Sequence, residues 1–274
     1  MSGCSCGHHH HHHHHDHEDT PQQGRELALA QPLVALSGHL TCHDPAQMFL
    51  VLDLLPEHVT LSRAEPGNLR FDLTQADDPM RWRLDELFAD DAAFAAHQDR
   101  TSASRWGTES AGLGRDFTRR AVMPHLRPEQ PRDHDRISAL LEQAFGGTAE
   151  AELVTRLRRD GDLALSMVAE AGGCILGHLS LSPLTAERPA LALAPVAVHP
   201  ALQGRGLGSA MIHAVLAELP EFTVVVLGEP DFYAGLGFAP ADLASPYAGP
   251  HLMQFGPALP KGSAITHARG FAGL

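Results

Sequence analysis

The chain has 274 residues, is 43% hydrophobic and carries a formal net charge of −13, which suggests two domains with ordinary hydrophobic cores. Residues 21–121 and residues 122–274 each have a formal net charge of −5. Neither half therefore has the basic bias of a nucleic-acid-binding protein. No apolar stretch reaches 18 residues, which excludes a sequence-predicted membrane span.

The chain begins with a Cys/His-rich segment. Residues 1–32 are expected to be a disordered tail, because the polar N-terminus has neither apolar periodicity nor the pattern of a signal peptide. Together with the isolated Cys42 and Cys174, this predicts a cytoplasmic protein. Thiols and imidazoles bind divalent metals, so the segment is either a metal-binding tail or a purification tag. The candidate ligands are Cys4, Cys6, His8, His10, His12, His14 and His17.

Residues 33–121 contain the pattern of a small α+β domain. Asp44-Pro45 predicts a helix start, and Pro56 predicts a bend or break in that helix. Helix residues 90–97 have acidic side chains in the first turn. Strands are predicted at residues 33–41, 69–73, 81–88 and 114–122. The order βαββαβ indicates a ferredoxin-like domain.

Three segments, E-P-G-N-L-R-F-D, D-D-P-M-R-W-R-L-D-E and F-A-D-D-A-A-F-A-A-H, resemble the antibiotic biosynthesis monooxygenase (ABM) family of α+β barrels. The resemblance implies a homodimer and a ligand pocket between sheet and helices, with Glu86 and His97 as pocket residues. It also implies alternative activities: oxidation of quinols or aromatics without metal or flavin, or binding of haem or another small molecule.

Residues 122–274 have a different order of elements. A strand end and helix are expected at 127–145, and a second helix at 151–157. Strands are expected at 163–171 and 174–182, around Gly172-Gly173, and at 191–198 and 222–227. Between the last two, a helix with apolar Leu207, Met211, Val215 and Leu219 follows a glycine-rich loop.

The glycine-rich loop is a candidate phosphate cradle, since free N–H groups at a helix N-terminus bind anions. Gly204, Gly206 and Gly208 have the spacing G-x-G-x-G, which fits a dinucleotide-binding loop poorly. A P-loop would need a lysine that is absent here. The third reading is Q-x-x-G-x-G, beginning at Gln203; an ordinary strand-to-helix turn is the remaining alternative.

The Q-x-x-G-x-G loop, followed by F-Y-x-x-x-G-F at Phe232–Phe238, resembles the GNAT superfamily of acyl-CoA N-acyltransferases. The resemblance implies a mixed, splayed central sheet and acetyl-CoA as co-substrate. The residues it assigns to the co-substrate are Val196, Ala197, Val198, Gln203, Gly204, Arg205, Gly206, Leu207, Gly208 and Ser209.

The same resemblance implies Tyr233 as the general acid for the CoA thiolate. Glu150 is a candidate base acting through water, although a solvated acid at a helix start is the alternative. The expected function is acetyl transfer to an unidentified amine, on a small molecule or a protein, by direct transfer in a ternary complex. The alternative is an ABM oxygenase or a haem or small-molecule sensor with a CoA-binding partner domain.

Overall fold

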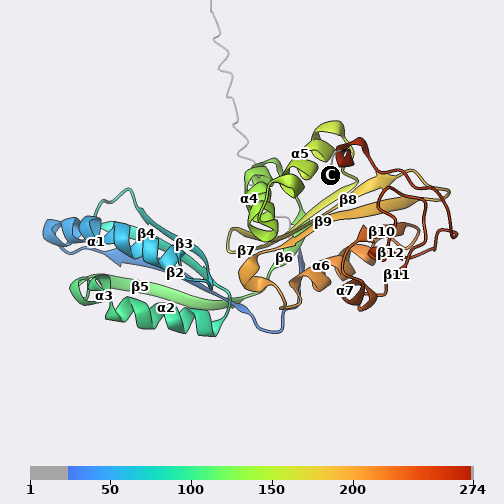
Figure 1. Ribbon diagram of the computed structural model, residues 1–274. Helices are drawn as coiled ribbons and strands as arrows, with labels where there is room; N and C mark the ends of the chain where they lie inside the picture. The colour runs from blue at the N-terminus through green and yellow to red at the C-terminus, as the bar shows by residue number, and fades with distance from the viewer. Residues whose placement is uncertain (1–23, 273–274) are drawn as a thin grey trace, which may run out of the picture.

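The computed structural model describes residues 24–272, which form two domains (Figure 1). The N-terminal domain has a four-stranded sheet, and the C-terminal domain is built on an eight-stranded sheet. Within these residues, none of the helices combines the length and the apolar character that a membrane crossing requires.

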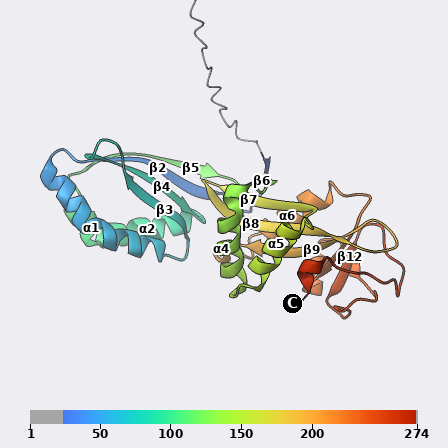
Figure 2. The same ribbon diagram turned by 90° about the horizontal axis from the view of Figure 1, so that it is seen from above.

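The N-terminal domain has the expected ferredoxin-like order. Its elements are β2 (Leu33–Thr41), α1 (Pro45–Arg63), β3 (Asn68–Gln75), β4 (Arg81–Phe88), α2 (Asp91–Ala103), α3 (Arg105–Glu109) and β5 (Gly114–Val122). The strands lie in the order β3-β4-β2-β5, and all neighbours are antiparallel. Helices α1 and α2 lie on the same face of this sheet (Figure 2), so the fold-class prediction for this half is confirmed.

Aspartate caps begin the two long helices of this domain. The Asp44 side chain accepts a hydrogen bond from the Gln47 backbone N–H at 2.9 Å, and Asp90 accepts one from Ala93 at 2.7 Å. Each cap satisfies a backbone donor that has no partner within its helix. The helix after Asp90 is longer than expected and ends at Ala103.

Of the bend or break expected at Pro56, the break does not occur, because α1 continues through Pro56 to Arg63. Proline removes the donor for the carbonyl four residues earlier, here Leu52. Leu52 is 45% exposed, so water can solvate that carbonyl. The buried Val51 and Leu54 keep the opposite side of the helix on the sheet.

The C-terminal domain begins with a strand that precedes the N-terminal domain in sequence. Its strands and longer helices are β1 (Arg25–Glu26), β6 (His125–Pro128), α4 (His134–Phe145), α5 (Ala149–Asp160), β7 (Leu165–Ala171), β8 (Cys174–Leu184), β9 (Ala190–Val198), α6 (Leu207–Leu216), β10 (Thr223–Leu227), α7 (Pro230–Ala234), β11 (Ala239–Pro240) and β12 (Leu252–Phe255). Three short 3-10 helices are η1 (Pro131–Asp133), η2 (Pro200–Leu202) and η3 (Arg269–Phe271). The strand order is β1-β6-β7-β8-β9-β10-β12-β11. Helices α4 and α5 cover one face of the sheet, and α6 and α7 cover the other (Figure 1).

The central sheet is mixed and splayed, as expected. Strand β9 pairs with β8 in antiparallel fashion as far as Val198, opposite Gly177. Its parallel pairing with β10 covers only Ala190 to Ala192. Beyond Ala192 the two strands separate, which leaves the β10-facing backbone edge of β9 without a strand partner in the described chain.

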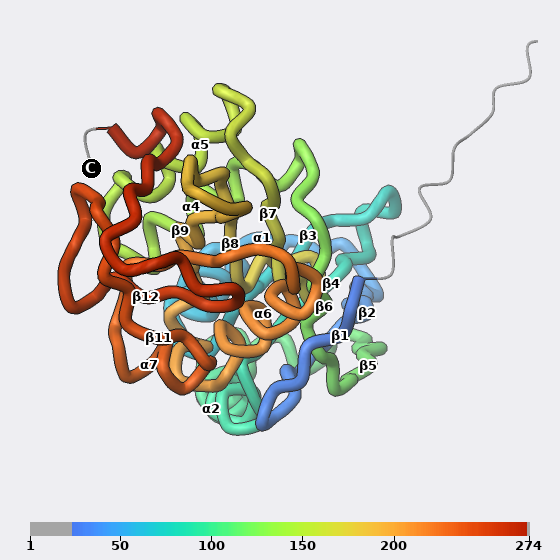
Figure 3. The backbone as a smooth tube through the Cα atoms, turned by 90° about the vertical axis from the view of Figure 1, so that its right-hand side faces the viewer, coloured from blue at the N-terminus to red at the C-terminus, as the bar shows by residue number. Residues whose placement is uncertain are grey.

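Two chain segments join the domains. Strand β1 pairs with β6, and Figure 3 shows them side by side. The Leu27 N–H then donates to the Pro124 carbonyl at 2.8 Å, beside the β2–β5 pairing. The expectation that residues 1–32 are a disordered tail is therefore wrong for Arg25–Leu27, because hydrogen bonds to β6 and burial of Leu27 order them. The candidate metal ligands from Cys4 to His17 lie outside the described residues.

The two domains also share one hydrophobic core. Leu33, Leu87 and Ala89 of the N-terminal domain belong to the same buried cluster as Leu126 and Leu202 of the C-terminal domain. Apolar packing and the paired crossing segments therefore hold the domains together.

Candidate active site

A cavity of about 700 Å³ opens where β9 and β10 separate. Its lining is largely apolar and comes from both faces of the sheet. The residues are Phe145, Glu150, Leu153, Ala192, Leu193, Ala194, Pro195, Val196, Val225, Val226, Leu227, Gly228, Glu229, Phe232, Tyr233, Tyr247, Leu252, His267 and Phe271. An apolar cavity with a few polar groups is typical of a small-molecule site.

The strand segment expected to bind a pantetheine arm forms one side of this opening. Val196, Ala197 and Val198 pair with β8 through one backbone edge only. Val196 lines the cavity, whereas the Ala197 side chain is buried against α4 in another apolar cluster. The other edge can pair with an extended ligand, as an added strand would.

The glycine loop lies between β9 and α6, as the motif predicts. Gly204 and Gly206 have φ values of 73° and 87°, which favour glycine, and an added Cβ would meet no atom within 4 Å. The first helical N–H of α6 that bonds within the helix is that of Ala210, which donates to the Gly206 carbonyl. The N–H groups of Leu207, Gly208 and Ser209 precede it and have no partner within the helix, so they are donors that could hold an anion.

The side chains of Gln203 and Arg205 hold the loop against other parts of the protein. Gln203 Nε2 donates to the Val198 carbonyl at 3.2 Å, which ties the loop to the end of β9. Arg205 Nη1 reaches the N-terminal domain, where it lies 2.6 Å from Asp90 Oδ2. The sequence motif indicated a phosphate contact for Arg205 and contained no sign of this partner.

Tyr233 lies on α7 and lines the cavity. Its ring packs edge-on against Phe232 and Phe238. Burial raises the pKa of Tyr233 to about 12, so the hydroxyl keeps its proton at neutral pH. Tyr233 and Val196 of β9 thus line the same cavity.

Glu150 lies in the first turn of α5 and lines the same cavity. Glu229, before α7, is a second carboxylate in the lining. The structure therefore places Glu150 and Tyr233, which are 83 residues apart in sequence, around one space.

The C-terminal segment supplies lining residues that sequence reasoning did not single out. The Tyr247 hydroxyl donates to the Phe271 carbonyl at 3.2 Å, and its ring packs edge-on against His267. Burial lowers the pKa of His267, so this ring is neutral at neutral pH. The chain has only two tyrosines, and that scarcity was the one sequence signal for Tyr247.

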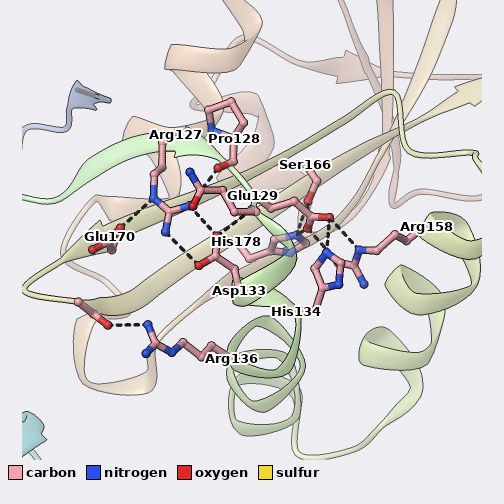
Figure 4. A network of polar contacts seen from close by, with 12 residues as sticks. Arg127, Pro128, Glu129, Asp133, His134, Arg136, Arg158, Ser166, Glu170 and His178 are labelled. Atoms are coloured by element: carbon pink, nitrogen blue, oxygen red, sulfur yellow. Dashed lines mark hydrogen bonds and ion pairs between the residues drawn. The ribbon is translucent and has the colours of Figure 1, made fainter. Parts of the chain in front are cut away.

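A polar network connects β6 of the central sheet with α4 and α5 (Figure 4). Arg127 on β6 makes two hydrogen bonds to Asp133, at 2.6 and 3.0 Å, and one to Glu170 at 2.8 Å. Glu129 accepts two from Arg158 on α5, at 2.8 and 2.9 Å. The network anchors the helix whose first turn carries Glu150.

Glu86 and His97, expected to be pocket residues, lie together inside the N-terminal domain. His97 Nε2 is 3.5 Å from Glu86 Oε1, and its Nδ1 is 2.8 Å from Glu65 Oε2. Arg100 Nε donates to the other Glu65 oxygen at 2.7 Å. Burial, and then the charge of Glu65, raise the pKa of Glu86 to about 8. This polar cluster, whose other members the sequence did not reveal, is separate from the cavity around Tyr233.

The described residues include no cluster of three or more His, Cys, Asp or Glu side chains arranged to hold a metal ion. Cys42 and Cys174 are free thiols.

Comparison with known proteins agrees with both halves of the structure. A model of the acetyltransferase (GNAT) family matches residues 127–238, and a model of the antibiotic biosynthesis monooxygenase family matches residues 39–108. The chain is 38% identical over 120 residues to the uncharacterized N-acetyltransferase YhbS of Escherichia coli strain K12, an alignment that covers 41% of this chain and 72% of YhbS. It is 34% identical over 119 residues to the uncharacterized N-acetyltransferase YjhQ of the same strain, covering 40% of this chain and 66% of YjhQ.

The fold of the C-terminal domain also has a solved counterpart. The crystal structure of YhbS from Escherichia coli in complex with CoA superposes with a TM-score of 0.51 at 30% identity. The superposition covers 58% of this chain and 95% of that one. The chain therefore belongs to the GNAT family of N-acetyltransferases and carries an ABM domain ahead of its acetyltransferase domain.

Proposed function

We propose that the C-terminal domain transfers an acetyl group from acetyl-CoA to an amine while both substrates are bound. The observation that carries this proposal is the meeting of the free β9 edge, Tyr233 and Glu150 at one cavity. The crystallisation of YhbS with CoA supports the choice of donor.

The proposed donor site extends from the cavity to the start of α6. The pantetheine arm pairs with the free backbone edge of Val196–Val198, which offers hydrogen bonds along an extended chain. The pyrophosphate binds the N–H groups of Leu207, Gly208 and Ser209 at the positive end of the α6 dipole.

Direct transfer needs no acyl-enzyme. No cysteine or serine is present among the described residues that line the cavity. The amine nitrogen attacks the thioester carbonyl carbon, the N–C bond forms, and the C–S bond breaks. The sulfur leaves with the bonding electron pair and takes the proton of the Tyr233 hydroxyl, which water then restores.

Tyr233 suits this role despite its raised pKa. Burial disfavours the charged phenolate, but it also disfavours the thiolate that develops in the same apolar cavity. The thiolate is therefore a stronger base there than in water. In the proposed mechanism, Glu150 accepts the proton that the attacking amine loses, through a water molecule.

Calorimetry with acetyl-CoA and the full chain tests the donor assignment, and absence of binding would refute it. Release of free thiol in the presence of an amine panel then identifies acceptors. With an acceptor in hand, Tyr233→Phe should lower kcat by about 10²–10⁴-fold while the affinity for acetyl-CoA stays nearly unchanged. An unchanged kcat would remove Tyr233 from its assigned role.

A further inference from the structure

The ABM domain touches the glycine loop of the acetyltransferase domain through one ion pair. Arg205 Nη1 lies 2.6 Å from Asp90 Oδ2 and donates to the Ala89 carbonyl at 3.1 Å. We infer that Asp90 is a positioning residue for acyl-CoA: it holds Arg205, and with it the loop, ready for the pyrophosphate. This inference rests on the proposed use of acetyl-CoA as donor.

Asp90, the ABM residue in this contact, is itself held in place. Asp90 caps α2 by accepting the Ala93 N–H at 2.7 Å, and its side chain is only 13% exposed. The Ala93 N–H, with Arg205, holds the pKa of Asp90 below its usual range, so the carboxylate is charged at neutral pH. Ala89 is buried in the core that the two domains share, together with Leu202 and Leu207 on either side of the loop.

On the acetyltransferase side, the contact is made by Arg205 of the glycine loop. Arg205 stands between Gly204 and Gly206, and no heavy atom lies within 4 Å of an added Cβ at either glycine. The Arg205 N–H donates to the Leu202 carbonyl at a long 3.3 Å. Gln203 ties the loop to the end of β9, and the Arg205 side chain fixes it laterally to the ABM domain.

The geometry favours cooperation with the ligand over competition for Arg205. Only Nη1 is used by Asp90 and Ala89; Nε and Nη2 make no hydrogen bond to any of residues 24–272. The Arg205 side chain is 36% exposed, so these donors can reach a phosphate oxygen. Because the guanidinium is planar, fixing Nη1 also fixes the direction of the remaining donors.

The test is the affinity of CoA for full-length variants, measured by calorimetry. Asp90→Asn keeps a good helix cap and removes the charge. It should weaken CoA binding about three- to tenfold, the range for loss of one partly exposed charged hydrogen bond. The KM for acetyl-CoA should rise by the same factor, with kcat unchanged.

Asp91→Asn is the matched control. It removes the same charge one residue away, from a carboxylate that pairs with Arg119 of the ABM domain and not with the loop. CoA affinity should stay at the wild-type value. An equal loss in both variants would mean that the Asp90–Arg205 contact is not its cause, and it would overturn the inference.

A double-mutant cycle addresses the route from Asp90 to the ligand. Arg205→Gln should weaken CoA binding more than Asp90→Asn does, and Asp90→Asn should add nothing in the Arg205→Gln background. Additive losses would overturn the inference. Thermal unfolding of each variant checks that α2 remains folded.

The outcomes separate the two claims. If wild-type protein binds CoA but Asp90→Asn binds it equally or more tightly, Asp90 does not position the loop and the acetyltransferase proposal stands. If wild-type protein binds no CoA, both claims fail.

Discussion

Gly228 leaves the space in which the Tyr233 ring lies. A Cβ at residue 228 would stand 2.2 Å from Tyr233 Cε2, far closer than two carbon atoms can approach. Gly228 follows β10 directly and lines the cavity, and its N–H donates to the His251 carbonyl at 3.0 Å. The absence of a side chain at this position therefore sets where the tyrosine hydroxyl can lie.

Gly228→Ala should lower kcat because the ring must move away from the added methyl group. A displacement of about 1 Å at a reacting group can cost about 100-fold in rate. Steady-state kinetics with an accepted amine gives the change in kcat. Gly147→Ala is the control, because an added Cβ there meets no atom within 4 Å. Wild-type kcat in Gly228→Ala would show that the ring position is unimportant.

Glu150→Gln should lower kcat/KM for the amine, because the amide cannot accept the proton that the amine loses. The expected loss is about 10²–10⁴-fold, the usual contribution of a general base. Glu152→Gln on the same helix is the control, since Glu152 pairs with Arg156 and is not part of the cavity lining. Equal rates in Glu150→Gln and wild type would leave Glu150 as a solvated helix-start acid.

Local signals predicted much of the fold. The bounds predicted for β2, β4 and β5 agree with the structure. In β4, the alternation of polar and apolar side chains corresponds to burial of Trp82 and Leu84 between the exposed Arg81 and Arg83. The glycine loop predicted the start of α6, since that start depends on residues close in sequence.

Contacts between distant residues were beyond prediction. The pairing of β1 with β6 joins residues 99 and 101 positions apart, and two polar residues carry no strand periodicity. The Arg205–Asp90 contact depends on how two domains pack, and neither residue's neighbours in sequence indicate it. His267 likewise reaches the cavity only because the C-terminal segment folds back over it.

Asp133→Asn should destabilise the protein, because it leaves the buried Arg127 guanidinium without its main counter-charge. Asp133 is fully buried and accepts two hydrogen bonds from Arg127. Breaking a buried pair of this kind costs about 3 kcal/mol or more in free energy of unfolding. Urea unfolding measures it. Asp160→Asn, which removes a carboxylate paired with the exposed Arg159, should leave the free energy of unfolding unchanged. Similar stability in both variants would contradict a supporting role for the network.

Glu86→Gln should make stability less dependent on pH between 6.5 and 8. The folded-state pKa of Glu86 is raised to about 8 by burial and the charge of Glu65, with Arg100 acting in the opposite direction. The folded protein therefore keeps this proton over a range in which the unfolded chain has already lost it. Wild-type stability falls as pH rises through this range, by about 1.4 kcal/mol per pH unit for one proton.

Glutamine cannot ionise, so this part of the fall should disappear in the variant. His97, which lies 3.5 Å from Glu86, and His58, which lies beside His97, have lowered pKa values because they are buried. Their unfolded imidazoles still bind protons near pH 6.5, so both histidines make stability rise with pH there, in wild type and in Glu86→Gln alike, and the difference between the two slopes reports Glu86. Urea unfolding at pH 6.5, 7.25 and 8 gives the slope, and Glu57→Gln, an exposed acid on α1, is the control. Parallel pH profiles for wild type and Glu86→Gln would show that Glu86 is ionised in the folded protein. A flatter profile confined to Glu86→Gln would establish a neutral carboxylic acid in the interior of the ABM domain, able to donate a hydrogen bond to His97 at neutral pH.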